Sequence, residues 1–86
     1  MQEKVQVHQY IMSVHAEIEM ENDALTFFDI EYAILTGKII ARQKEHKNGK
    51  LKYLIKGYTL TGSEIIVVTQ LTRFTDEIII ITVFLL

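Results

Sequence analysis

The stretch that decides the fold is KIIARQKEHKNGKLKYLIK, residues 38–56. Two runs rich in strand-forming residues, Ile39–Gln43 and Lys52–Ile55, flank Lys47-Asn48-Gly49-Lys50. Asn-Gly favours positive φ at both central residues of a tight turn, so this stretch predicts a β-hairpin.

Downstream of the hairpin, the sequence predicts two more strands. Thr61-Gly62 marks a turn into Ile65–Thr69, and Arg73–Asp76 connects that run to Ile78–Leu86. Both runs are almost continuously apolar and β-branched, which indicates strands covered on both faces. A fifth strand at Val5–Val7 is a weaker prediction.

Upstream of the hairpin, residue spacing predicts two short helices. Ser13 is a good N-cap for the first, whose apolar stripe would be Val14, Ile18 and Leu25, with a break at Asn22-Asp23.

The second helix would begin after Thr26, because Asp29 three residues later suits the positive end of a helix. Gly37 is a natural C′ residue. Its expected apolar stripe is Phe27, Ile30, Ala33 and Ile34. The predicted fold class is α+β: one domain, residues 1–86, with two N-terminal helices packed on a four-stranded, mostly antiparallel meander.

Composition narrows the class of protein. With 86 residues, 49% of them hydrophobic and 23% charged, the chain is expected to form one small globular domain. The absence of cysteine excludes disulfides, thiolate metal sites and a cysteine nucleophile. The longest apolar run is too short for a membrane span and the start lacks a signal-peptide pattern, so we expect a cytoplasmic protein without membrane contact.

Charge is segregated along the chain. Residues 1–37 carry one cation against seven carboxylates, and residues 38–56 carry seven cations against one carboxylate. Cations with interleaved tyrosines can hold a phosphate backbone while the rings stack on bases. The predicted RNA-binding residues are Arg42, Lys50, Lys52, Lys56 and Tyr58.

A plainer interpretation of the same lysines stays open. Lysines on an edge hairpin protect against strand-to-strand aggregation, and the acidic helices can neutralise them within the fold. Alternation places Lys50, Lys52 and Lys56 on one strand face and Tyr53 on the other.

His15 is the side chain best suited to chemistry. It lies in the first turn of the predicted helix, where the helix dipole favours the neutral imidazole that acts as a general base. A structural role, with the ring hydrogen-bonded to a neighbouring loop, is the alternative. His8 and His46 add no metal-ligand spacing, so neither a metal nor a cofactor is expected.

The run Ser13-Val14-His15-Ala16, followed by Leu25-Thr26 and Gly37-Lys38-Ile39-Ile40, resembles a family of small bacterial proteins. This family is known as domain of unknown function 4258 and is grouped with the RelE- and ParE-like toxin fold. The resemblance continues through Lys52–Gly57 to Ile80–Val83. It implies a metal-independent ribonuclease or another toxin-type activity, RNA or the ribosome as target, and an antitoxin as partner.

The resemblance also implies that His15 and Thr82 are catalytic residues facing a concave sheet surface. One departure counts against nuclease activity: Glu19 and Ser63 stand where the family carries basic residues, and a carboxylate repels phosphate. The alternative is a non-catalytic interaction domain that forms a homodimer or binds another protein. A small-ligand binder is a third hypothesis that no residue pattern specifies.

Overall fold

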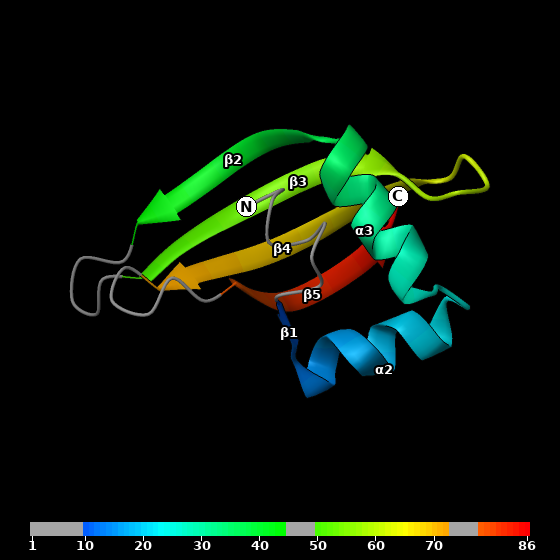
Figure 1. Ribbon diagram of the computed structural model, residues 1–86, viewed down its shortest axis with the longest axis horizontal. Coiled ribbons are helices and arrows are strands. Elements are labelled where there is room, and N and C mark those ends of the chain that lie inside the picture. The colour runs from blue at the N-terminus through cyan, green and yellow to red at the C-terminus, as the bar shows by residue number, and fades with distance from the viewer. Residues whose placement is uncertain (1–9, 45–49, 73–77) are drawn as a thin grey trace.

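The computed structural model describes residues 10–44, 50–72 and 78–86, which form two helices and a five-stranded mixed sheet (Figure 1). The elements in chain order are β1 (Ile11–Met12), α2 (Val14–Asn22), α3 (Phe27–Thr36), β2 (Lys38–Lys44), β3 (Lys50–Tyr58), β4 (Glu64–Thr72) and β5 (Ile78–Leu85). The α+β class is confirmed. The predicted Asn48-Gly49 turn, the connection at 73–76 and the strand at Val5–Val7 lie outside the described residues.

The expected four-stranded meander is wrong in one respect, because β1 adds a fifth strand. The strand order is β1-β5-β4-β3-β2, with β2 to β5 antiparallel in sequence order. β1 pairs in parallel with β5, so that Ile11 lies opposite Ile79. Two residues are too few for a strand pattern, and their pairing partner lies at the other end of the chain.

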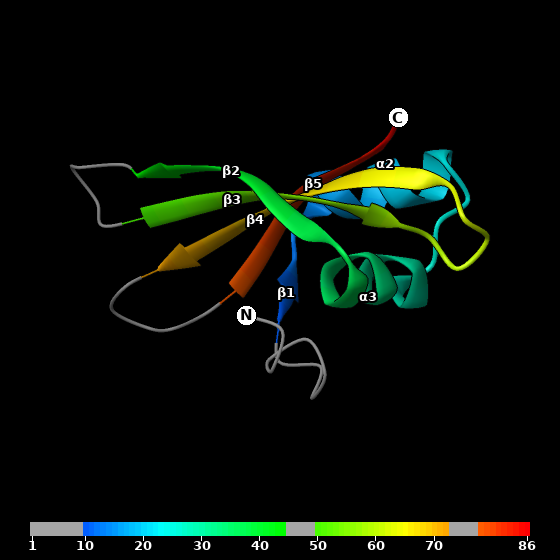
Figure 2. The ribbon, with the colours of Figure 1, turned by 90° about the horizontal axis from the view of Figure 1, so that it is seen from above.

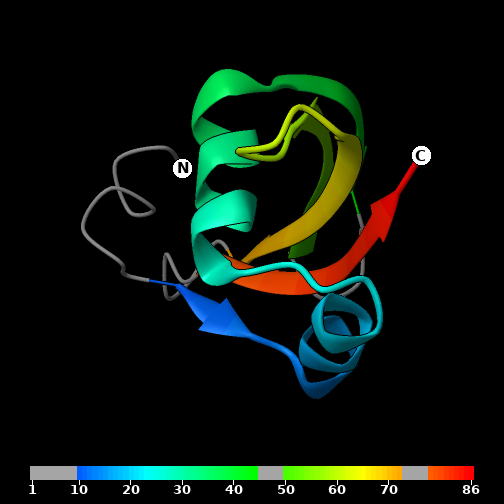
Figure 3. The same ribbon diagram turned by 90° about the vertical axis from the view of Figure 1, so that its right-hand side faces the viewer.

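The sheet has two different faces. The register places Ile55, Val67 and Val83 in one row, and these buried side chains belong to the core together with α3 residues. The sheet curves around α3, so this inner face is concave (Figure 3). We call the opposite face, which carries Lys52, Lys56 and the other alternate residues of β3, the outer face.

Two glycines let α3 approach β3 closely. A Cβ on Gly57 would lie 2.3 Å from the Ala33 carbonyl oxygen, and one on Gly37 would lie 2.4 Å from the same atom. Gly37 has φ −87° and ψ −179°, so it ends α3 as the C-cap, in extended backbone, rather than as the predicted C′ residue. A glycine is required at position 37 because α3 packs closely on the sheet.

Helix α2 packs along β5 on the side where β1 pairs only with Ile79 and Ile80. Seen from above, α3 lies on one side of the sheet, whereas α2 lies level with the strands (Figure 2). Its buried residues are Ala16 and Met20, while Val14 is 72% exposed and Ile18 51% exposed. The predicted stripe for α2 is therefore wrong: these larger side chains face away from the core. In α3, Ile30, Ala33 and Ile34 are buried as predicted, and Phe27 is half-exposed.

Thr26 and Asp29 form a complete capping box at the start of α3. The Thr26 hydroxyl accepts from the Asp29 N–H, and Asp29 Oδ2 accepts from the Thr26 N–H at 3.0 Å. Asp29 Oδ1 also accepts from the Leu60 N–H at 3.0 Å, which ties α3 to the β3–β4 turn. In that turn Gly62 has a φ of +90°, as expected for the predicted Thr61-Gly62 turn. None of the described helices is long and apolar enough to cross a membrane.

Asp29 gives the fold a pH dependence. The backbone hydrogen bond from Thr26 lowers the pKa of Asp29 against the opposing effect of burial, and the Leu60 N–H lowers it further. Because the pKa is depressed in the folded state, the stabilisation is present above the unfolded pKa of about 3.9 and is lost as pH falls through the folded pKa. We expect Asp29→Asn to flatten the dependence of the urea midpoint on pH below about 4. An unchanged acid limb in this variant would contradict the assignment.

Candidate functional site

Ser13 holds the start of α2 against β5 and so positions His15. The Ser13 hydroxyl accepts from the Ala16 N–H at 3.1 Å, as predicted for an N-cap, and donates to the Ile81 carbonyl at 2.8 Å. The Ser13 N–H donates to the Ile80 carbonyl at 3.0 Å. These bonds leave the His15 side chain 69% exposed, one turn from the edge of the sheet.

Glu19 joins His15 to the last strand. Its Oε1 lies 3.4 Å from His15 Nε2, and the same oxygen accepts from the Thr82 hydroxyl and from the Val83 N–H at 3.0 Å. The Glu19 side chain is 24% exposed, which is far less than His15. The structure therefore brings the two predicted catalytic residues, His15 and Thr82, to one carboxylate, and we call these three residues the His15 cluster.

The His15 cluster has the chemistry of acid–base catalysis. A carboxylate beside Nε2 orients the ring and stabilises the imidazolium, which leaves Nδ1 to exchange a proton with a substrate. Such contacts are often loose in the absence of substrate, so a separation of 3.4 Å is compatible with this role. The same carboxylate also satisfies the Val83 N–H at the edge of the sheet, which is a structural function.

All three predicted RNA-binding lysines share the outer face. Alternation along β3 places Lys50, Lys52, Lys56 and Tyr58 on this face, and Tyr58 is 50% exposed. Thr82 lies on the same face, because it pairs with Val68, which in turn pairs with Leu54. Leu54, between Lys52 and Lys56, is thus two strand spacings from Thr82, about 10 Å.

The charge of this face is partly compensated. Lys56 Nζ lies 3.5 Å from Glu64 Oε2, in an ion pair whose two side chains are 45% and 43% exposed. At such exposure the pair is weak and can be exchanged for a phosphate.

Arg42 does not join these lysines. A bulge between Ile39 and Ala41 sets the register of β2 so that Arg42 lies opposite Tyr53, on the inner face. There the two side chains line a small cavity of about 340 Å³ with Gln43, Lys44 and Leu51. The predicted RNA-binding set is therefore divided between the two faces of the sheet.

Thr82 does not face the concave surface. Thr82 and the Val68 opposite it alternate with Val83 and Val67, whose side chains belong to the core on the inner face, so Thr82 lies on the convex outer face. Contacts within the fold, rather than contacts with a substrate, explain the position of Glu19. Its carboxylate accepts a hydrogen bond from the Val83 N–H at the edge of the sheet. The i, i+4 spacing of His15 and Glu19 on one helix face was the sequence signal for their contact.

Within the residues that the structure describes, no three His, Cys, Asp or Glu side chains are grouped so that they could hold a metal ion.

Comparison with known proteins gives one result. A family model described as Domain of unknown function (DUF4258) matches residues 12–85, which includes every strand and helix above from Met12 onward. No curated protein and no solved structure matches the chain significantly. Because the match covers far more than half of the sequence, the chain belongs to the DUF4258 family.

Proposed function

We propose that this chain is a toxin-type domain of the RelE-like group that contacts RNA or the ribosome. In this proposal the outer face binds the phosphate backbone and His15 carries out acid–base chemistry on the bound strand. The observation that supports it is the position of the His15 cluster, which lies at the edge of the same face that carries Lys50, Lys52 and Lys56. An antitoxin would be the natural partner of such a domain.

The cleavage step needs only groups of this chain and water. Neutral His15 accepts the proton of a 2′-hydroxyl, whose oxygen attacks the adjacent phosphorus while the bond to the 5′ oxygen breaks. Water supplies the proton of the new 5′-hydroxyl, and the other product is a 2′,3′-cyclic phosphate. Glu19 orients His15 during this transfer, and lysines of the outer face compensate the negative charge that grows on the phosphate.

Binding to single-stranded RNA tests the first half of the proposal. We expect log Kd to depend linearly on log salt concentration, as it does when phosphates displace counterions. The double variant Lys52→Gln/Lys56→Gln should bind about tenfold more weakly and show a slope smaller by about 1.4, because two single-strand phosphate contacts are lost. Fluorescence anisotropy of a labelled 12-nucleotide RNA measures both quantities.

A matched control removes the same charge from the other face. Arg42→Gln/Lys44→Gln deletes two cations of β2 whose register places them on the inner face, so its salt slope should stay close to that of the unmodified chain. Equal effects of the two double variants would show that net charge, rather than the outer face, determines binding. Failure of the unmodified chain to bind RNA at low salt would overturn the proposal.

A non-catalytic interaction domain is the second candidate. It is favoured by Glu19, whose negative charge lies 3.4 Å from the imidazole, where a bound phosphate would be repelled. It is also favoured by exposed apolar side chains along α2, Val14 and Ile18. Self-association of the chain in sedimentation, together with no binding or cleavage of RNA, would support this second function.

A further inference from the structure

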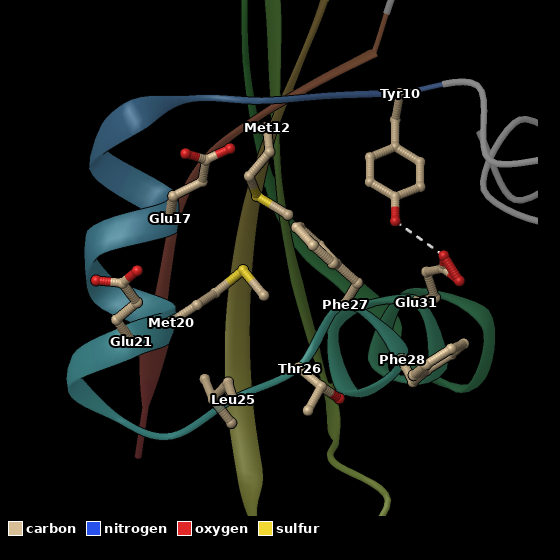
Figure 4. Close-up of a pocket in the computed structure, with 10 residues that line it drawn as sticks. All are labelled: Tyr10, Met12, Glu17, Met20, Glu21, Leu25, Thr26, Phe27, Phe28 and Glu31. Atoms are coloured by element: carbon tan, nitrogen blue, oxygen red, sulfur yellow. Dashed lines mark hydrogen bonds between the residues drawn. The ribbon is translucent and has the colours of Figure 1, made fainter.

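Helices α2 and α3 enclose a groove that the His15 cluster does not use. The groove has a volume of about 960 Å³ and is drawn in Figure 4. Its α2 side is formed by Glu17, Met20 and Glu21. Glu17 and Glu21 are two residues away from Glu19, which is about 200° around a helix, so the groove and the His15 cluster lie on opposite sides of α2.

The floor of the groove is apolar and adaptable. In Figure 4 the side chains of Met12, Met20 and Phe27 point toward its centre, and Leu25 closes one end. Thioethers are flexible and polarisable, so methionines accommodate side chains of different shape. Phe28, in the first turn of α3, also lines the groove and is 68% exposed. The folded chain therefore leaves large apolar groups at the surface, a feature of interaction sites.

The charged side chains that line the groove from the described part of the chain are carboxylates. Glu17 and Glu21 stand on α2 and Glu31 on α3, and no lysine or arginine lines the groove among the residues that the structure describes. Tyr10 donates to Glu31 Oε2 at 2.8 Å. Burial, with the hydrogen bond and charge of Glu31, raises the pKa of Tyr10 above its ordinary value, so the phenol stays neutral.

We propose that this groove binds a cationic amphipathic segment of another protein. Its apolar side chains would lie on the methionine and phenylalanine floor, and its lysines or arginines would face Glu17 and Glu21. The carboxylates repel nucleic acids and anionic lipids, which excludes these ligands from the groove. The proposal concerns a surface separate from the outer face and does not depend on RNA binding.

A pair of designed peptides tests the chemistry of the partner. The probe is a 16-residue peptide with leucines on one helix face and lysines on the other, and its twin carries glutamate in place of every lysine. We expect the lysine peptide to bind the full chain in calorimetry and the glutamate twin to bind at least tenfold more weakly. Binding of the lysine peptide should be at least tenfold weaker in the double variant Glu17→Gln/Glu21→Gln and in the single variant Phe28→Ala.

Controls separate the groove from general charge and from folding. Asp23→Asn/Glu64→Gln removes two carboxylates outside the groove and should leave peptide binding unchanged. RNA binding by Glu17→Gln/Glu21→Gln should not fall, which keeps this test distinct from that of the outer face. Equal binding of the two peptides, or of the two double variants, would overturn the proposal. A dimer of the free chain in sedimentation that Phe28→Ala dissociates would also overturn it, in favour of a second copy as the occupant.

Discussion

Gly57→Ala is expected to destabilise the fold by about 3 kcal/mol or more, because helix α3 cannot retain its place on β3. The new Cβ would lie 2.3 Å from the Ala33 carbonyl oxygen and 2.9 Å from the Ala33 carbonyl carbon and Cα. All three are backbone atoms, so no rotamer change relieves the overlap and the whole helix must move. Thermal unfolding followed by circular dichroism should show a Tm lower by more than about 10 °C.

Gly62→Ala is the matched control for the Gly57 variant. Gly62 has a φ of +90°, but a Cβ there meets no atom within 4 Å. The control therefore carries the strain of a left-handed alanine, about 1 kcal/mol, without a steric overlap. If Gly57→Ala lost no more stability than Gly62→Ala, the close approach of α3 to β3 would be contradicted.

His15→Ala is expected to reduce RNA cleavage about 100-fold or more, the usual contribution of a general base. The measurement is the rate of cleavage of an end-labelled single-stranded RNA in the presence of EDTA, since the proposed step uses no metal ion. His15 is 69% exposed, so the substitution should leave the fold intact. Val14→Ala, an exposed neighbour in the same turn, should cleave at the unmodified rate.

Glu19→Gln separates orientation of the imidazole from repulsion of the phosphate. Glutamine keeps an oxygen that accepts from the Val83 N–H, but it removes the negative charge beside His15. We expect kcat to fall, because the imidazolium loses its stabilising carboxylate, and RNA to bind more tightly. A role of Glu19 limited to stability would change neither quantity.

Cleavage by His15→Ala at the unmodified rate would contradict the catalytic half of the proposal and leave the interaction domain as the remaining function.

The parts of the fold predicted correctly depend on local chemistry. Ser13 and Thr26 were identifiable as N-caps because a hydroxyl there accepts an N–H three residues away, whatever the rest of the chain does. Strands β2 to β5 followed from runs of β-branched residues between turn signals.

The parts that failed depend on contacts between distant residues. β1 is a strand only because Ile11 pairs with Ile79, and no local pattern records that pairing. In α2, Val14–Ile18 and Ala16–Met20 have the same spacing, and hydrophobicity favours the first pair. The second pair is buried, because this orientation brings Glu19 to the Val83 N–H. Packing against the edge of β5 thus decides which side of the helix is inside.

The His15 cluster is assembled from segments that are far apart in the sequence. Glu19 and Thr82 are 63 residues apart, and Ser13 is 68 residues from the carbonyl of Ile81 that it contacts. During synthesis, α2 leaves the ribosome long before β5 exists, so a nascent chain lacks the strand against which His15 is positioned. Such high contact order slows folding, and it also delays any activity of this site until translation of the last strand is complete.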